Sequence, residues 1–171
     1  MSKFKLRVLV PQNWAEYKLL RLSALKESPD SFGSTYEKEI AFSDLEWIER
    51  LRANFNGMIS LPLVAELDGN LVGLAWGVIH HSDEKVAHIY QMWVSPEARG
   101  KGIAMSFLNE LKMWALNNGC TSIELEVTTN NDAAVGLYKI FGFQAEGVEK
   151  ELRAGSRLLT QQMVMALDYA A

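Results

Sequence analysis

The sequence contains little of what disulfide-linked, secreted or membrane-spanning proteins need. Its single cysteine, Cys120, excludes a disulfide within the chain and favours a reducing compartment. Cys120 follows the turn residues Asn117-Asn118-Gly119 and has no histidine near it in the sequence, so we expect it to pack in the core rather than act as a nucleophile. No apolar run approaches the ~18 residues of a membrane span, and the N-terminal MSKFKLRVLVPQ lacks a signal-peptide core and cleavage site. We therefore expect a cytoplasmic protein that does not associate with membranes.

An excess of positive charge is also missing. The chain has 17 Lys and Arg against 21 Asp and Glu, so its net charge is −4. Nucleic acids and anionic membranes attract basic surfaces, and we expect neither as a partner. A mildly acidic surface suits a cationic partner such as an amine, although such a surface is also ordinary for soluble proteins.

Histidines are scarce as well, and no group of His, Cys, Asp or Glu has the spacing of a metal site. We therefore expect no bound metal. The Gly-x-Ser-x-Gly motif of serine hydrolases does not occur. His88 falls on an expected strand and could relay a proton, whereas His80 and His81 end another strand beside an expected exposed loop at 82–84. For all three histidines a structural role is the favoured interpretation.

What the sequence does contain is enough apolar residues for one well-buried domain. Its 171 residues are 49% hydrophobic, which predicts a single domain over residues 1–171. Periodicity and turn residues predict the order β-α-α-β-β-β-α-β-α-β-β. The strands are expected at 5–9, 61–67, 71–81, 87–94, 122–127, 144–153 and 158–167. The helices are expected at 11–27, 44–54, 102–118 and 132–141.

Two local signals mark the ends of these elements. Asp68-Gly69-Asn70 predicts a tight hairpin turn between two strands. Ser43, followed by Glu46 three positions later, predicts a capping box at the start of the helix 44–54.

The most informative stretch is AHIYQMWVSPEARGKGIA, residues 87–104. An aromatic and β-branched run predicts a strand, Ser95-Pro96-Glu97-Ala98 interrupts it, and a helix with regularly spaced apolar residues starts near Gly102. Glycines at the start of a helix leave little side-chain bulk, so backbone N–H groups there can approach a ligand closely. The partial positive charge of the helix N-terminus favours an anion. We therefore expect this loop to bind phosphate.

Three phosphate-binding patterns compete for the loop. The P-loop motif needs Ser or Thr directly after its Gly-Lys pair. In this loop Lys101 lies between two glycines, and no Ser or Thr follows Gly102. The dinucleotide fingerprint is half met by Gly100 and Gly102, but Met105 stands in place of its third small residue. The third pattern, R/Q-x-x-G-x-G/A, is met in full by Arg99, Gly102 and Ala104. It is the pyrophosphate loop of the GNAT N-acetyltransferase superfamily, which the sequence resembles.

A second segment strengthens the resemblance. EVTTNNDAAVGLYKIFGF, residues 126–143, is similar to the second acetyl-CoA segment of the superfamily, where N-x-x-A-x-x-L-Y-x-x-x-G-F follows a strand. The matching residues are Asn131, Ala134, Leu137, Tyr138, Gly142 and Phe143. Residues 122–143 are also similar to ribosomal-protein N-terminal acetyltransferases. Two motifs in this order, separated by one helix and one strand, argue against a chance match.

The resemblance implies an α/β fold of the GNAT type. Such a fold is a mixed, mostly antiparallel sheet with helices on both faces and a V-shaped split between its central strands. The split would expose main-chain groups to the pantetheine arm of acetyl-CoA, the implied cosubstrate. The implied cofactor-binding residues are Met92, Trp93 and Val94 for the arm, Arg99, Gly100, Lys101, Gly102, Ile103 and Ala104 for the pyrophosphate, and Asn131.

Acetyl transfer to an amine requires a proton donor for the departing thiolate. By the resemblance, Tyr138 is the catalytic general acid, because it matches the superfamily tyrosine near the thioester sulfur. Outside the motif, a helix tyrosine beside Leu137 and Phe141 would more often point into the core. Some members turn over without a proton donor at this position, so a packing role for Tyr138 stays open.

The reaction also requires a neutral amine, because an alkylamine with a pKa near ~10 is mostly protonated at neutral pH. Glu126 is the expected catalytic base, since it precedes Tyr138 by the same twelve residues as the glutamate of the ribosomal-protein enzymes. Strand alternation places Glu124 and Glu126 on one face, and desolvation beside a cleft would raise the pKa of a carboxylate. The alternatives are a water chain, His88, or a Glu126 that is only a polar strand residue.

These observations leave three hypotheses for the function. The first is an acetyl-CoA-dependent N-acetyltransferase in which a primary amine, on a small molecule or a peptide, attacks the thioester directly. The second is a non-catalytic acyl-CoA-binding module of the same fold, and the third is a dinucleotide-binding protein. Retention of the expected base and acid favours the enzyme. Nothing selects the acceptor, although Phe32, Tyr36 and Trp47 are candidates to line its site, and the resemblance also allows a homodimer.

Overall fold

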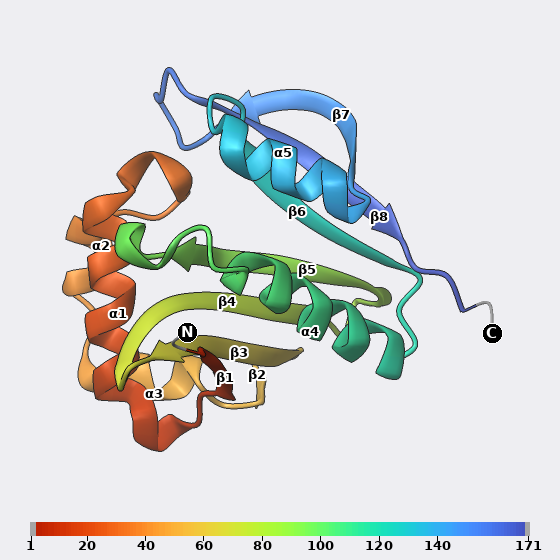
Figure 1. Cartoon of the computed structure of the whole chain (residues 1–171). Coiled ribbons are helices and arrows are strands. Elements are labelled where there is room, and N and C mark those ends of the chain that lie inside the picture. Colours follow the sequence, from red (N-terminus) through yellow and green to blue (C-terminus); the bar gives the residue numbers. More distant parts are fainter. Residues whose placement is uncertain (1–2, 170–171) are drawn as a thin grey trace.

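The computed structural model describes residues 3–169, which form one mixed sheet with helices on both faces (Figure 1). The strands are β1 (Lys5–Val8), β2 (Asn54–Phe55), β3 (Met58–Leu67), β4 (Asn70–His80), β5 (Asp83–Val94), β6 (Ser122–Thr128), β7 (Gln144–Glu151) and β8 (Leu159–Ala166). The helices are α1 (Trp14–Glu27), α2 (Tyr36–Ile40), α3 (Asp44–Arg50), α4 (Ile103–Asn117) and α5 (Asp132–Phe141). Short 3-10 turns occur as η1 (Pro11–Asn13), η2 (Pro29–Ser31) and η3 (Pro96–Ala98).

The strands lie in the order β1-β3-β4-β5-β6-β8-β7, with β2 pairing the first residues of β3. Neighbouring strands are antiparallel except β5 and β6, which run parallel. The β5–β6 pairing extends only from Val86 opposite Ser122 to Ile89 opposite Leu125, and beyond it the two strands separate (Figure 1). The mostly antiparallel sheet with a V-shaped split is therefore confirmed.

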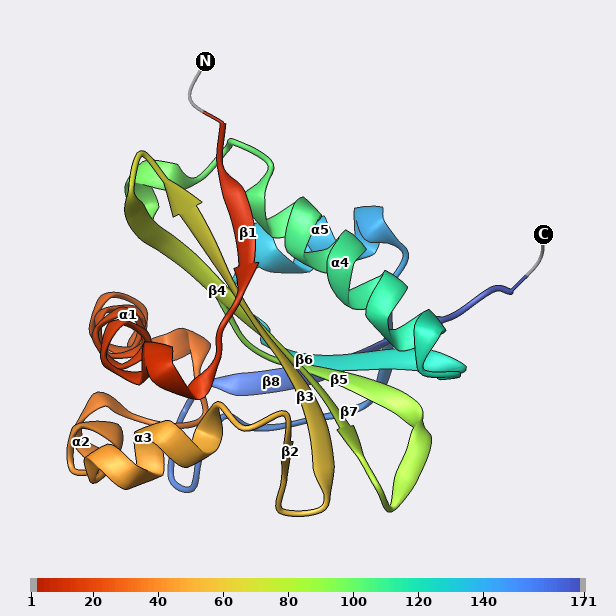
Figure 2. The same cartoon turned by 90° about the horizontal axis from the view of Figure 1, so that it is seen from below.

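Helices cover the two faces of this sheet, as expected (Figure 2). On one face, α4 and α5 pack over an apolar cluster that contains Phe107. On the other face, α1 and α3 pack over a second cluster that contains Trp47. Successive residues of β3 alternate between the two, because Leu63 and Ala65 belong to the first cluster and Val64 to the second. Burial on both faces explains why the central strands are almost continuously apolar.

The two local signals are confirmed. Asp68 (φ 50°) and Gly69 (φ 81°) both adopt the left-handed conformation that a two-residue hairpin turn requires between β3 and β4. At the start of α3, the Ser43 hydroxyl accepts a hydrogen bond from the Glu46 backbone N–H at 3.2 Å. In return, the Glu46 carboxylate accepts one from the Ser43 N–H at 2.6 Å.

Several boundaries differ from the prediction. The sequence did not predict α2 or β2, and α3 ends at Arg50 instead of Asn54 because the next residues leave the helix to form β2. Strand β3 begins at Met58 and β5 at Asp83, both earlier than the apolar runs suggested. Asp83 pairs with His80, so part of the expected loop at 82–84 belongs to a strand. Backbone pairing extends β5 into the polar residues 83–85, which an apolar pattern does not detect, whereas the added residues of β3 include the apolar Met58 and Ile59.

Strand β5 carries a bulge that no sequence signal predicted. Trp76 of β4 pairs with Tyr90, whereas Leu74 pairs with Trp93, so β5 has one residue more than β4 between the two pairs. Gln91 in this interval has a φ of 56°, which is uncommon for a residue with a side chain. Because a bulge bends its strand, and this one lies just beyond the last β5–β6 pair, it contributes to the split.

Candidate active site

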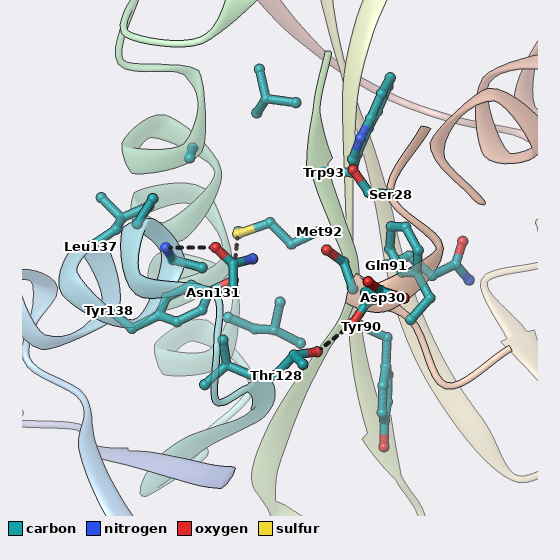
Figure 3. Close-up of a pocket in the computed structure, with 18 of the residues that line it drawn as sticks. Ser28, Asp30, Tyr90, Gln91, Met92, Trp93, Thr128, Asn131, Leu137 and Tyr138 are labelled. Carbon is teal, nitrogen blue, oxygen red and sulfur yellow. Dashed lines mark hydrogen bonds between the residues drawn. The ribbon is translucent and has the colours of Figure 1, made fainter. Parts of the chain in front are cut away.

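The separated ends of β5 and β6 enclose a cavity of about 1090 Å³. Its walls come from β5, β6, α5, the loop between η3 and α4, and residues 28–34 after α1. Figure 3 shows Tyr138, Leu137 and Asn131 on one side of the cavity and Gln91 and Asp30 on the other. The predicted site residues that line it are Met92, Trp93, Val94, Arg99, Gly100, Gly102, Ile103, Ala104, Glu126, Asn131 and Tyr138.

The loop before α4 brings the N-terminus of a 15-residue helix to this cavity. Gly100 (φ 78°) and Gly102 (φ 85°) adopt left-handed conformations that favour glycine. Gly102 is the N-cap of α4 and provides no side-chain cap, so the first N–H groups of the helix keep their capacity to bind a ligand. The helix dipole adds partial positive charge. This end of the cavity can therefore hold a diphosphate.

The side chain of Arg99 shapes this loop. Its Nε donates a hydrogen bond to the Val94 carbonyl at 2.9 Å, and its Nη2 donates one to the Glu27 carboxylate at 3.2 Å. Trp93 Nε1 donates to the same carboxylate at 2.8 Å. Burial raises the pKa of Glu27, but hydrogen bonds from its neighbours and the Arg99 charge outweigh burial and lower it overall. Lys101 is exposed and lies outside the described wall of the cavity.

The main chain of Met92–Val94 has one edge turned to β4 and the other to the cavity. Trp93 pairs with Leu74 and Val94 with Gly73 on the β4 side. On the other side, the described pairing with β6 has already ended at Ile89. Apart from the Val94 carbonyl, which accepts from Arg99, the backbone groups on that edge can bond the amides of an extended ligand.

Tyr138 lies on α5 with 8% of its surface exposed. Its hydroxyl donates a hydrogen bond to the sulfur of Met92 at 3.4 Å (Figure 3). The Phe143 ring packs against the Tyr138 ring edge-on at 5.8 Å. Burial raises the pKa of Tyr138 to about 12. The phenol is therefore protonated at neutral pH and can donate a proton across the cavity.

Asn131 is the N-cap of α5. Its side-chain oxygen accepts a hydrogen bond from the Ala134 N–H at 3.2 Å (Figure 3). Asn131 also lines the cavity. The cap fixes the start of the helix that carries Tyr138.

Glu126 lies on the face of β6 opposite to α5. Alternation along β6 buries Leu125 and Val127 in the cluster under α4 and α5 and turns Glu124 and Glu126 to the other face, as predicted. The Glu126 side chain is 56% exposed, and its carboxylate lies 3.9 Å from the ammonium of Lys150. Glu126 lines the cavity from this side.

A smaller cleft of about 270 Å³ adjoins the cavity at Tyr90 and Glu126. His88 lies in it, with Nδ1 3.8 Å from the Glu124 carboxylate and its ring stacked on Tyr90 at 5.9 Å. Burial lowers the pKa of His88 more than the Glu124 charge raises it, so this imidazole is neutral at neutral pH. Burial and the charges of Glu126 and Glu124 raise the pKa of Tyr90. His80 packs edge-on against His88 at 5.3 Å.

Residues 28–34 close the cavity on the side of α1. The Thr128 hydroxyl donates a hydrogen bond to the Asp30 carbonyl at 2.7 Å (Figure 3), and Arg153 donates one to the Pro29 carbonyl at 3.0 Å. Of the three candidates for an acceptor site, Phe32 lines the cavity, whereas Tyr36 packs against the second apolar cluster and is not among the described wall residues. Trp47 does not take this role, because it is fully buried in the second apolar cluster.

Comparison with known proteins agrees with this geometry. The sequence pattern of the Acetyltransferase (GNAT) family matches residues 22–143 of the chain. The chain belongs to this GNAT acetyltransferase family. The matched region contains both the glycine loop before α4 and the segment that carries Tyr138.

Solved acetyltransferase structures share the fold over nearly the whole chain. An acetyltransferase of the GNAT family from Streptococcus pneumoniae superposes with a TM-score of 0.79 at 22% identity, covering 97% of this chain and 100% of that one. The acetyltransferase yncA from Salmonella typhimurium, described with its cofactor acetyl-CoA, gives 0.73 at 18% identity, covering 99% and 97%. A chimera of the Vibrio cholerae spermidine N-acetyltransferase SpeG and hSSAT gives 0.69 at 25% identity, covering 97% and 96%.

The GNAT motifs gave no signal for much of the cavity wall formed by Arg21, residues 28–34, Tyr90 and Gln91, which we call the acceptor side. Arg21, Tyr90 and Gln91 line the cavity, and none belongs to either motif. Gln91 is held by a hydrogen bond from the buried Tyr17 hydroxyl at 2.8 Å. The separation of Tyr17 and Gln91 by 74 positions explains why sequence patterns miss such a contact.

Two further features of the described residues bear on function. Within residues 3–169, no three His, Cys, Asp or Glu side chains are grouped so that they could hold a metal ion. No helix in the same part of the chain is long and apolar enough to cross a membrane.

Proposed function

We propose that the protein is an acetyl-CoA-dependent N-acetyltransferase in which an amine attacks the thioester directly, with one catalytic domain over residues 1–171. The observation that carries this proposal is that one cavity contains the glycine loop at the start of α4 and the buried, protonated Tyr138. Family membership supports acetyl transfer. The acetyl-CoA of the yncA structure supports the donor.

In this proposal the chain holds the donor mainly through its backbone. The N–H groups of Gly100–Ala104 and the N-terminus of α4 bind the diphosphate. The free edge of Met92–Val94 pairs with the amides of the pantetheine arm. Asn131, which lines the cavity at the start of α5, forms a hydrogen bond with the cofactor. Arg99 acts indirectly, because its guanidinium orders the loop through Val94 and Glu27.

The transfer needs a proton removed from the acceptor and a proton given to the leaving group. Glu126 accepts a proton from the ammonium form of the acceptor, and the neutral nitrogen bonds to the acetyl carbon. The carbon–sulfur bond breaks, and Tyr138 gives its proton to the departing thiolate. The nitrogen then releases its second proton to solvent, and Tyr138 recovers a proton from solvent, so the products are an N-acetylated amine and CoA. Glu126 and Tyr138 approach the cavity from opposite faces of β6.

The acceptor is a primary amine on a small molecule or a peptide. The similarity of residues 122–143 to ribosomal-protein enzymes favours a peptide α-amine, whereas the likeness to the spermidine N-acetyltransferase chimera favours a small polyamine. We also propose a cytoplasmic location, which the single, buried Cys120 supports.

The proposal is tested by CoA release from acetyl-CoA across a panel of amines, amino acids and short peptides, with an enzyme-only blank. We expect turnover with at least one acceptor class. Acetyl-CoA binding in a calorimeter without turnover on any acceptor would support the binding-module hypothesis instead. Binding of NAD without binding of CoA would support a dinucleotide-binding protein.

A further inference from the structure

A buried cluster of charges lies behind the acceptor side of the cavity. Arg21 of α1 donates two hydrogen bonds to the Glu39 carboxylate, from Nε at 3.1 Å and from Nη2 at 2.7 Å. Arg50 of α3 donates a third, from Nη1 at 2.6 Å. Glu39 is fully buried and Arg21 is 4% exposed, whereas the Arg50 side chain is 30% exposed. One carboxylate therefore serves two guanidinium groups.

The cluster leaves one buried donor without a partner. Among the described residues, no group accepts a hydrogen bond from Nη1 of Arg21, and this nitrogen is inaccessible to solvent. The neighbouring Tyr17 does not supply a negative charge, because burial raises the pKa of its phenol. A buried charged group with an unused donor is costly unless a ligand or an ion completes its bonds.

Arg21 differs from Arg50 in its position. Arg21 lines the cavity beside the 28–34 loop, and its guanidinium lies over the ring of Phe32 at 4.7 Å. Arg50 is not among the described residues of the cavity wall, and it packs over Phe42 and Trp47 instead. The unused donor therefore belongs to a side chain of the acceptor side.

We propose that the acceptor is an amine that also carries a carboxylate or a similar anionic group, as in an α-amino acid or its close analogues. Arg21 Nη1 receives the anionic group, and Glu126 on the β6 side of the same cavity receives the ammonium. The Phe32 ring lies over the guanidinium, and Nη1 is inaccessible to solvent, so the assignment requires side chains here to shift when the anionic group enters. This assignment rests on the proposed acetyltransferase function and names the substrate class of its site.

The wild-type protein provides the first test. CoA release is measured for matched sets of acceptors: an amino acid, its α-carboxamide, and the amine that lacks the carboxyl group. We expect kcat/KM for the amino acid to exceed the other two by roughly tenfold to a hundredfold, which is the effect of a charge-assisted hydrogen bond. Equal or better use of the carboxamides and plain amines would overturn the assignment while leaving acetyl transfer itself established.

Two variants then test whether Arg21 causes the preference for acceptors that carry a carboxylate. Arg21→Met keeps much of the apolar stem and removes the donor, so the preference for the carboxylate should disappear. Arg50→Met is the matched control, because it removes a guanidinium from the same Glu39 carboxylate at a position outside the cavity wall, and it should keep the preference. Because Arg21→Met leaves the buried Glu39 with Arg50 as its remaining arginine partner and could fail to fold, the double variant Arg21→Met/Glu39→Gln removes that charge as well.

Calorimetry adds a measurement that is independent of turnover. The amino acids and their carboxamides are titrated into the protein in the presence of CoA. Wild-type and Arg50→Met proteins should bind the carboxylate forms more tightly, and the Arg21 variants should bind both forms alike. An unchanged preference in the Arg21 variants, in either assay, would assign the anionic group to a different residue and refute the proposal. Lack of turnover with every amine, together with selective amino-acid binding, would instead contradict the proposed catalysis and still support an amino-acid-binding site at Arg21.

Discussion

Tyr138 and Glu126 both line the cavity, but their side chains lie in different environments. Tyr138 is packed among apolar side chains under α5, and this burial keeps its phenol protonated. Glu126 is more than half exposed on the other face of β6, where Lys150 is its neighbour. The proposed acid and base therefore reach one cavity from opposite faces of β6, one buried and one in contact with solvent.

Removal of the Tyr138 hydroxyl should therefore slow the chemical step. We expect Tyr138→Phe to lower kcat by roughly a hundredfold, with acetyl-CoA affinity nearly unchanged because the ring still packs. In the wild type, ionisation of Tyr138 should not reduce kcat near pH 10, where a free tyrosine ionises, because its pKa is about 12. Steady-state kinetics over a pH series and calorimetry measure both effects, and unchanged kcat in the variant would exclude Tyr138 as the acid.

The role of Glu126 predicts a different pH signature. Glu126→Gln should lower kcat/KM most at neutral pH, where the acceptor is protonated, and least at high pH, where the amine is neutral without help. Lys150→Met serves as the control, because it removes the neighbouring charge and keeps the carboxylate. If the activity ratio of Glu126→Gln to wild type does not change with pH, a water chain or His88 accepts the proton.

At the scale of elements, the N-terminus of α4 and the split between β5 and β6 are made by the backbone. Gly100 and Gly102 turn the chain through left-handed conformations, and the bulge at Gln91 bends β5 beyond its last pair with β6. The hydrogen bond from Tyr17 holds the Gln91 side chain against α1. Main-chain geometry therefore forms the donor site, and few side chains are specific to it.

A methyl group at Gly102 should weaken donor binding through this geometry. Nothing lies within 4 Å of the position a Cβ would take, so the cost comes from the φ of 85°. A left-handed Ala costs about 1–2 kcal/mol, and we expect Gly102→Ala to weaken acetyl-CoA binding by about tenfold. The matched control is Gly136→Ala in α5, which also has open space around it, and it should stabilise the fold by about 0.5–1 kcal/mol without affecting binding. Equal affinity in both variants would show that the loop tolerates a different backbone.

At the scale of the molecule, one buried carboxylate links three helices on the α1 face of the sheet. Glu39 of α2 binds Arg21 of α1 and Arg50 of α3. Burial raises the pKa of Glu39, but the hydrogen bonds and charges of the two arginines outweigh burial and lower it overall. The native state therefore favours the charged carboxylate. Its contribution to stability is complete above the unfolded pKa and is lost as the pH falls through the lower, folded pKa.

Replacing Glu39 with a neutral residue should reveal how much its charged carboxylate contributes to the stability of the fold. Glu39→Gln is expected to lower the free energy of unfolding by about 3 kcal/mol at neutral pH, because two arginines lose their shared charge. The gap to the wild type should narrow in acid, as the wild-type carboxyl becomes protonated. Glu37→Gln, an exposed position on the same helix, should behave as the wild type. Denaturant unfolding at several pH values measures these differences, and a gap that is independent of pH would contradict the assigned role.

The sequence alone determined the parts of the protein that depend on local chemistry. The bounds of α5, the cap at Ser43 and the hairpin turn at Asp68-Gly69 follow from residues close together in the chain. The alternation along β6 also fixed which face carries Glu126. The donor loop was predictable for the same reason, because a phosphate site built from backbone N–H groups needs only glycines and a helix start.

Only the tertiary structure decided the acceptor side. Arg21 and Glu39 are separated by 18 positions, Tyr17 and Gln91 by 74, and Thr128 and Asp30 by 98. No periodicity or motif relates such pairs, because their contacts depend on how α1, α2 and the sheet pack. The bulge at Gln91 and the unused donor of Arg21 have the same origin. Local sequence thus determined the glycine loop at the start of α4, whereas packing between distant segments decided which side chains, such as Arg21 and Gln91, line the rest of the cavity.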